Sequence, residues 1–156
     1  MIRIDKIEQW EYEAGMYSFR ELQKACKKTV EGTENKLVVL GNCATQFLAA
    51  AIEGYAKLTG LNLNVFNADY NQIDAQLLDP FSEVNSFAAE EILLWLGTEK
   101  IYEEFLDLDM SARSRFADSY LQKIEHYWEL ISNNSNARIM QMNFSEIDDK
   151  VLGSFS

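Results

Sequence analysis

Histidine, proline, cysteine and glycine are all scarce in this chain. Its 156 residues include one histidine, one proline, two cysteines and seven glycines. Two cysteines cannot form a disulfide framework, and such sparse use is typical of a cytoplasmic protein whose thiols stay reduced. No spacing of cysteine and histidine matches a zinc site, so we expect no metal and no cofactor.

Positive charge is also in short supply. The 14 Lys and Arg residues stand against 25 Asp and Glu residues, which gives a net charge of −11. Binding to nucleic acid requires Lys and Arg to displace the counterions of the phosphates. We therefore expect no nucleic-acid partner, and the same deficit disfavours docking to an anionic membrane surface.

Long apolar runs are absent as well. Glu53 interrupts the longest candidate, so no segment reaches the roughly 18 apolar residues of a membrane-spanning helix. The first residues, Met1 to Lys6, alternate in polarity and lack the apolar core of a signal peptide. Together with the reduced thiols, these features predict a cytoplasmic protein that does not enter a membrane.

Short apolar runs alternate with helical patterns along the chain. We expect strands at 37–40, 61–66, 92–96 and 138–144, and helices at 18–30, 44–59, 99–106 and 111–132, with two short helices inside 72–89. This alternation predicts a parallel sheet covered on both faces. The expected fold is an α/β three-layer sandwich of flavodoxin-like architecture. One domain spans 1–156, with an N-terminal extension at 1–17 and an irregular tail at 145–156 that can lead into a further domain.

Ligands of such sheets bind beyond the carboxyl ends of the strands. The loops that follow the expected strands therefore predict a ligand cleft. Its candidate residues are Gly41, Asn42, Thr45, Asn67, Asp69, Gly97, Thr98, Glu99 and Asn143.

Cys43 is the candidate nucleophile, because it lies in a strand-to-helix turn where the helix N-terminus favours a thiolate. The alternative is a small residue that simply fits a tight turn. His126 is expected on the exposed side of the last long helix, which leaves Cys43 without the usual general base. Cys26 follows the helical spacing of Phe19 and Leu22 and is expected in the core.

Two blocks of the chain resemble those of SGNH (GDSL-type) hydrolases. Gly41–Thr45 is similar to the first block, with Cys43 at the serine position, and Leu96–Lys100 is similar to the third. Glu99 stands where that family has the asparagine that donates to the oxyanion, and a carboxylate repels an oxyanion. The closing aspartate–histidine block is missing, so the catalytic set is incomplete.

A closer resemblance covers most of the chain. The segments that carry it are Ser18–Leu22, Leu37–Leu48, Val65–Gln72, Leu78–Glu83 and Ile139–Phe144. In this order they resemble the amino-terminal, SGNH-hydrolase-like domain of FkbH-like proteins. In that family the domain precedes a phosphatase domain of the haloacid-dehalogenase type, subclass IIIC. Asp107-Leu108-Asp109 imitates the phosphatase aspartate motif but follows a helical segment instead of a buried strand, so we assign it to chance.

The resemblance implies a non-catalytic recognition or accessory domain. Such a domain would act with a phosphatase or acyltransferase partner in carrier-bound, glyceryl-type acyl metabolism or in surface-polysaccharide biosynthesis. The implied partners are an acyl carrier protein or an adjoining phosphatase domain, and a carrier would contact the basic face of Arg20, Lys24, Lys27 and Lys28. The alternative is a thiol-dependent acyl hydrolase or acyltransferase that uses Cys43. A third reading is a small-molecule sensor that uses the same cleft; the oligomeric state stays open.

Overall fold

The computed structural model describes residues 17–147. The elements, in chain order, are α2 (Phe19–Ala25), β1 (Asn35–Gly41), α3 (Gln46–Leu58), β2 (Leu63–Asn67), α4 (Ile73–Leu78), α5 (Glu83–Phe87), β3 (Glu91–Trp95), α6 (Thr98–Leu106), α7 (Met110–Arg113), α8 (Phe116–Asn134) and β4 (Arg138–Gln141). Most of the expected extension at 1–17 and of the expected tail at 145–156 lies outside the described residues.

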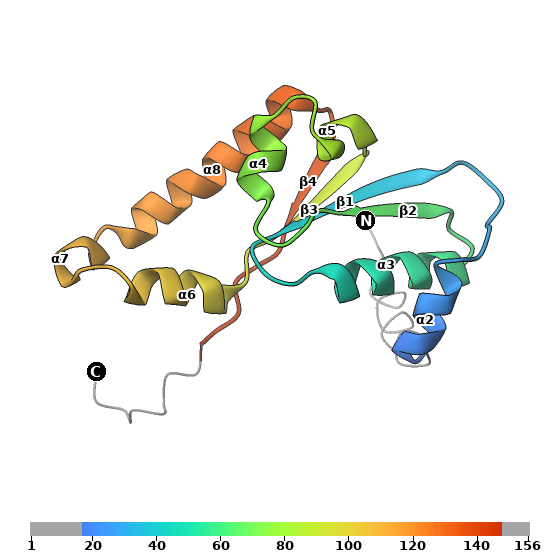
Figure 1. Cartoon of the computed structure of the whole chain (residues 1–156), viewed down its shortest axis with the longest axis horizontal. Coiled ribbons are helices and arrows are strands. Elements are labelled where there is room, and N and C mark those ends of the chain that lie inside the picture. Colours follow the sequence, from blue (N-terminus) through green and yellow to red (C-terminus); the bar gives the residue numbers. More distant parts are fainter. Residues whose placement is uncertain (1–16, 148–156) are drawn as a thin grey trace, which may run out of the picture.

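The four strands form one parallel sheet in the order β2-β1-β3-β4. Helices α2 and α3 lie on one side of it, and α4, α5 and α8 lie on the other (Figure 1). This arrangement confirms the predicted α/β sandwich with a parallel sheet. The strand order is the one in which doubly wound, flavodoxin-like sheets begin.

Strand β1 supplies both faces of the sheet with apolar side chains. Val38 and Leu40 belong to the cluster under α8, whereas Leu37 and Val39 belong to the cluster under α3. Successive side chains of a strand point to opposite faces, so a continuous apolar run is what a strand covered on both sides requires.

Helix α2 is shorter than its sequence pattern predicts. It ends at Ala25, the helix's buried residue, instead of near Val30. Cys26 is therefore not the core residue we expected: it caps the helix and is half-buried, with Sγ donating to the carbonyl groups of Leu22 and Ala50. Phe19 is 36% exposed. The helical spacing failed here because the chain leaves the helix before Cys26 can turn inward.

The segment from 107 to 134 also departs from the prediction of one long helix. Asp109 stands at the start of a separate short helix, α7, and α8 begins only at Phe116. The guanidinium of Arg113 donates to the carbonyl groups of Leu106 and Leu108, which holds the corner between α6 and α7. The predicted helix at 111–132 is therefore divided in two, and Ser111 lies inside α7.

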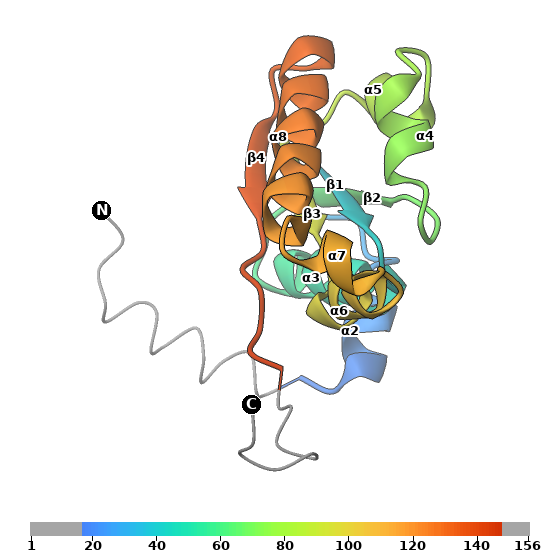
Figure 2. The ribbon, with the colours of Figure 1, turned by 90° about the vertical axis from the view of Figure 1, so that its left-hand side faces the viewer.

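Helix α8 runs alongside β4, the last strand of the sheet (Figure 2). The indole Nε1 of Trp128 donates to Gln141 Oε1 at 3.4 Å and ties the two elements. Strand β4 ends at Gln141, three residues earlier than predicted, although Met142 N still donates to Leu94 O. Within residues 17–147, none of the helices combines the length and apolarity that a bilayer crossing needs.

Candidate functional site

Parallel sheets bind ligands where the strand order reverses, and here that point lies between β1 and β3. A cavity of about 410 Å³ opens at this edge. We call it the strand-end cavity; its lining residues are Cys43, Ala44, Trp95, Gly97, Thr98, Glu99, Met142, Asn143 and Ser145. They come from the turn after β1, from the end of β3 and the start of α6, and from the segment that follows β4.

Asn42 ties the turn after β1 to the turn after β3. Its Oδ1 accepts a hydrogen bond of 2.7 Å from the backbone N–H of Gly97, and the backbone N–H of Asn42 donates to Trp95 O. The side chain is only 9% exposed, and its Nδ2 has no hydrogen-bond partner among residues 17–147. The amide thus fixes the two turns that carry Cys43 and Glu99.

Gly41 is required by this close approach. A Cβ at this position would lie 2.5 Å from Thr45 Cγ2 and 3.2 Å from Trp95 O. Because the carbonyl belongs to the neighbouring strand, it cannot move aside without disturbing the sheet. Glycine therefore lets the β1 turn pass directly beside β3.

Thr45 and Asn67 form a second polar tie at the same edge. Thr45 is 2% exposed and donates through Oγ1 to Asn67 Oδ1 at 2.7 Å. Asn67 Nδ2 in turn donates to Ala68 O. The pair holds the start of α3 against the end of β2, beside the strand-end cavity but outside its lining.

Cys43 is half-buried and lines the cavity. Burial raises the pKa of its thiol; the backbone N–H of Gly97 opposes that shift, and the carboxylate of Glu99 adds to it. The net direction is opposite to the one expected from a helix N-terminus. A raised pKa disfavours the thiolate, which is the nucleophilic form of cysteine.

The segment after β4 closes one side of the cavity. Ser145 donates to Thr98 Oγ1 from its backbone N–H at 2.9 Å and from its hydroxyl at 3.2 Å. Asn143, an exposed residue of this segment, lines the cavity opposite the Cys43 turn. Ser145 thus ties the segment after β4 to the wall of the candidate site.

The predicted cleft residues fall into three groups. Cys43, Gly97, Thr98, Glu99 and Asn143 line the cavity, and Gly41, Asn42, Thr45 and Asn67 form its support. Asp69 is exposed in the loop after β2 and does not line the cavity.

Neither an imidazole base nor a metal cluster accompanies the cavity within residues 17–147. His126 is on the exposed side of α8, as predicted, and is not among the lining residues. No cluster of three or more His, Cys, Asp or Glu side chains suited to a metal ion occurs within the described range 17–147.

Sequence reasoning missed Ala44, Trp95, Met142 and Ser145 as lining residues, although Ala44 is the direct neighbour of Cys43. A signal existed for Trp95, because strand alternation places it on the opposite face from the buried Leu94 and Leu96. No signal marked Met142 or Ser145, which reach the cavity only because β4 ends at Gln141 and the chain then passes Thr98.

These features define an α/β domain with a cavity at the switch point of a doubly wound sheet. A family model described as FkbH, N-terminal domain, matches residues 36–156. The chain belongs to this family of FkbH N-terminal domains, as the sequence resemblance predicted.

One solved structure is similar along almost the whole chain. It is described as the N-terminal part of the protein BF1531 from Bacteroides fragilis, containing a phosphatase domain and complexed with Mg. The identity is 29% and the TM-score is 0.75, over 90% of this chain and 36% of that chain. This chain thus spans about a third of the length of that structure. No curated protein matches the chain.

Proposed function

We propose that this chain is a non-catalytic, SGNH-like recognition domain that acts beside a phosphatase domain. Its ligand would be a carrier-bound acyl group of the glyceryl type or a precursor of a surface polysaccharide. The strand-end cavity would hold that ligand, because its volume of about 410 Å³ falls within the range of small-molecule sites.

The observation that carries the proposal is the charge beside Cys43. Glu99 lines the same cavity and raises the pKa of the Cys43 thiol, in addition to the larger effect of burial. An acyl-transfer site needs hydrogen-bond donors where negative charge develops on the carbonyl oxygen, and a carboxylate there opposes that charge. His126 lies outside the cavity, so no imidazole serves as a base.

The partnership with a phosphatase is supported by the similar structure, which contains a phosphatase domain and is much longer than this chain. The hydrogen bonds from Ser145 to Thr98 show that the segment after β4, which leads toward the C-terminus, borders the cavity. Sequencing the gene downstream tests this part: an in-frame phosphatase domain is expected, and a stop codon with no phosphatase gene nearby would contradict it.

A carrier protein is usually acidic, and so is this chain, with a net charge of −11. A carrier would therefore contact the basic side of α2. Arg20, Lys24 and Lys27 border a hollow of about 460 Å³ there. Charge reversal at Lys24 and Lys27 is expected to abolish binding to a proven acyl carrier protein, whereas reversal at Lys100 serves as the control.

The catalytic test uses short acyl esters and thioesters. We expect the purified chain and Cys43→Ala to show the same background rate of hydrolysis. The rate is measured from the alcohol or thiol that the reaction releases. Cys26→Ala controls for general thiol reactivity. Turnover that disappears in Cys43→Ala but survives in Cys26→Ala would overturn the non-catalytic assignment.

That outcome would favour the second candidate, a thiol-dependent acyl hydrolase or acyltransferase. The position of Cys43 in the cavity wall, beside the backbone N–H of Gly97, is the feature that supports it. Its sulfur would attack the acyl carbonyl and form a thioester. The leaving alcohol or thiol would take up the proton that Cys43 releases, and water or an acceptor would then cleave the thioester.

A further inference from the structure

Helices α2 and α3, on one face of the sheet, lie directly against each other (Figure 1). The carbonyl oxygen of Leu22 comes so close to Gly54 that a Cβ there would lie 2.2 Å from it. The hollow of about 460 Å³ on this side of the molecule is lined by residues of α2, by the two residues Cys26 and Lys27 that follow it, and by Ala50 of α3. We call it the α2–α3 hollow.

The hollow is positively charged in a strongly acidic chain. Arg20, Lys24 and Lys27 line it, and all three are exposed. None of them belongs to an ion pair within residues 17–147. Since the chain has a net charge of −11, this local excess of cations runs against its overall composition.

The acids of the two helices are engaged elsewhere. Glu21 is the acid of α2, and its Oε2 accepts hydrogen bonds from the backbone N–H and the hydroxyl of Ser18. Glu53 is the acid of α3, and it pairs with Lys57 at 2.6 Å. Neither carboxylate lines the hollow, so its cations are left to attract a negatively charged partner.

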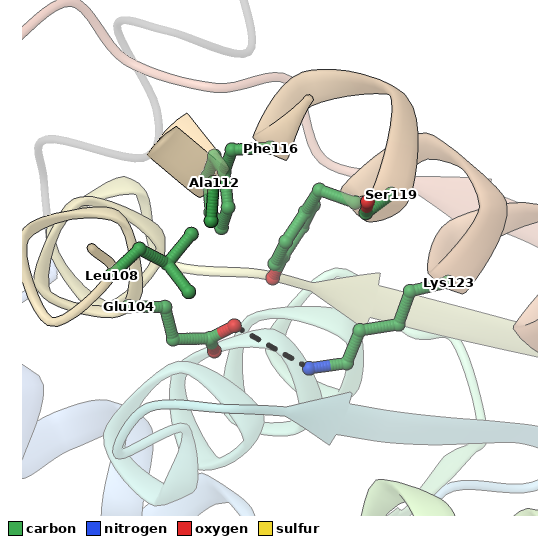
Figure 3. Close-up of a pocket in the computed structure, with 7 residues that line it drawn as sticks. Glu104, Leu108, Ala112, Phe116, Ser119 and Lys123 are labelled. Carbon is green, nitrogen blue, oxygen red and sulfur yellow. Dashed lines mark ion pairs between the residues drawn. The ribbon is translucent and has the colours of Figure 1, made fainter. Parts of the chain in front are cut away.

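A cavity of about 320 Å³ among α6, α7 and α8 shows the opposite situation (Figure 3). Its two charged lining residues, Glu104 and Lys123, reach toward each other, with Oε2 and Nζ 3.6 Å apart. Each offsets the charge of the other. That cavity therefore presents no uncompensated charge, whereas the α2–α3 hollow presents three cations.

An exposed aromatic pair stands at one end of the hollow. The rings of Phe19 and Phe47 pack edge to face with their centres 5.4 Å apart, and the residues are 36% and 63% exposed. Phe19 lies one turn before Gln23 and Phe47 lies one turn before Ala50, and both of these later residues line the hollow. The two rings hold each other in place and present an apolar surface beside the cations.

A helix from another protein would satisfy both features at once. Protein interfaces combine aromatic anchors with polar and charged side chains around them. A small anion would use the cations but leave the aromatic pair exposed, and an uncharged apolar ligand would leave the cations without a partner. An amphipathic helix brings acids and apolar side chains together, and such helices bind in grooves of this kind.

We propose that the α2–α3 hollow docks an acidic amphipathic helix of a partner protein, with the Phe19–Phe47 pair as the apolar anchor. Arg20, Lys24 and Lys27 face the acids of that helix. The proposal goes beyond the carrier contact, because it assigns most of the affinity to the aromatic pair and applies to any partner that presents such a helix. It does not depend on the ligand of the strand-end cavity.

The test uses a model peptide of roughly 20 residues, long enough to be helical alone, with a leucine stripe and a glutamate face. Two matched peptides carry alanine in place of the leucines or lysine in place of the glutamates. Each is titrated into the 156-residue chain, and the backbone NMR signals of α2 and α3 report binding. We expect the acidic leucine peptide to bind there and the other two to bind at least about tenfold more weakly.

Variants of the chain separate the anchor from the charge. Phe47→Ala should weaken the acidic leucine peptide about tenfold or more, as loss of an aromatic anchor does. Its control is Phe81→Ala, which removes a phenylalanine that is 89% exposed in the turn between α4 and α5, on the other face of the sheet.

Arg20→Glu should weaken the same peptide about three- to tenfold at low salt, and about 1 M salt should remove most of this difference. Arg115→Glu, at an exposed arginine before α8, is the matched control and should leave binding unchanged. Circular dichroism reports that each variant is folded.

Four outcomes would overturn the proposal. They are the absence of shifts in α2 and α3 up to about 1 mM acidic peptide, equal affinity of the parent and Phe47→Ala, full displacement of the peptide by pyrophosphate, and shifts that depend on the concentration of the chain alone. Pyrophosphate displacement would mark a small-anion site, and the last outcome would mark a contact between two copies. The signals of Gly41 and Gly97 report the strand-end cavity separately.

Discussion

The two faces of the sheet bury apolar side chains to very different extents. Under α8 the core cluster extends across β1 and β3 to α4, α5 and the full length of α8. Under α3 the buried cluster consists of Leu37, Val39, Ala49 and Leu93. The smaller buried cluster on the α3 face is accompanied by close packing of the backbone. The buried residues of α3, Ala49, Gly54 and Ala56, are small and let α2 and the sheet lie near the helix.

This difference explains where the candidate site lies. The ties of Asn42 to Gly97 and of Thr45 to Asn67 occur at the strand ends, where the thinner cluster under α3 stops. Polar contacts fix geometry more strictly than apolar packing does, since hydrogen bonds depend on direction. The larger apolar cluster under α8 contributes most of the stability, and the hydrogen bonds at the strand ends fix the turns around the strand-end cavity.

The sharpest comparison is between two leucines of the same strand. Leu40 is 0% exposed in the cluster under α8, and Leu37 is 5% exposed in the cluster under α3. We expect Leu40→Ala to cost about 4–5 kcal/mol and Leu37→Ala about 2–3 kcal/mol, because the thinner face can collapse around the lost volume. Urea denaturation measures both losses. Equal losses would contradict the prediction that the α8 face of the sheet contributes more to stability than the α3 face.

The next largest effect concerns the contact between α2 and α3. A Cβ on Gly54 would lie 2.2 Å from the carbonyl oxygen of Leu22, so α2 must move away in Gly54→Ala. We expect a loss of about 3 kcal/mol in the free energy of unfolding, at the upper end for overpacking.

Displacement of α2 should also expose the thiol of Cys26, whose Sγ donates to Leu22 O and Ala50 O. Faster reaction of Cys26 with a thiol reagent is therefore expected in Gly54→Ala. Gln46→Ala, an exposed substitution on the same helix, is the control. An unchanged rate in Gly54→Ala would mean that α2 is not held where the structure places it.

A smaller effect is expected from the tie between α3 and β2. Thr45→Val keeps the shape of the side chain but removes the donor to Asn67 Oδ1. The cost should be about 1–2 kcal/mol, since the acceptor loses its partner in a half-buried position. Tyr127→Phe is the counterpart on the α8 face and should cost less, because its acceptor on Asp74 is exposed to water. The reverse order would contradict the reliance of the α3 face on polar ties.

The smallest expected effect is a pH dependence of the free energy of unfolding that arises from the two thiols. Burial raises the pKa of Cys26 and of Cys43 above the ordinary value of 9.0. The folded chain holds these protons more tightly than the unfolded chain, so this contribution to stability is complete below pH 9.0. It disappears as the pH rises through the higher folded values.

Iodoacetamide alkylation of the variants Cys26→Ala and Cys43→Ala measures each remaining thiol alone. The midpoint of the rate against pH should lie above 9.0 in the folded chain and return to about 9.0 in urea. A midpoint below 9.0 for Cys43 would mark an activated nucleophile and favour the catalytic alternative.

Much of the fold could be predicted from the chain itself, and the errors have a common cause. The runs around Val38, Val65 and Leu93 predicted strands because a parallel sheet buried on both faces needs continuous apolar segments. The predicted end of α2 and the predicted start of α8 were wrong, because helical spacing extends beyond the residues where tertiary contacts turn the chain. Arg113, for example, bonds to the carbonyl groups of Leu106 and Leu108 and holds a corner that the pattern does not reveal.

The sequence by itself determined the class of fold, the strand-end position of the candidate site and the membership in the FkbH N-terminal family. These depend on local patterns that any fold of the chain must respect. Only the tertiary structure decided that Asn42 bonds to Gly97 and that Asp69 lies outside the strand-end cavity. Each of these depends on distances between segments far apart in the chain, and packing of the whole domain sets those distances.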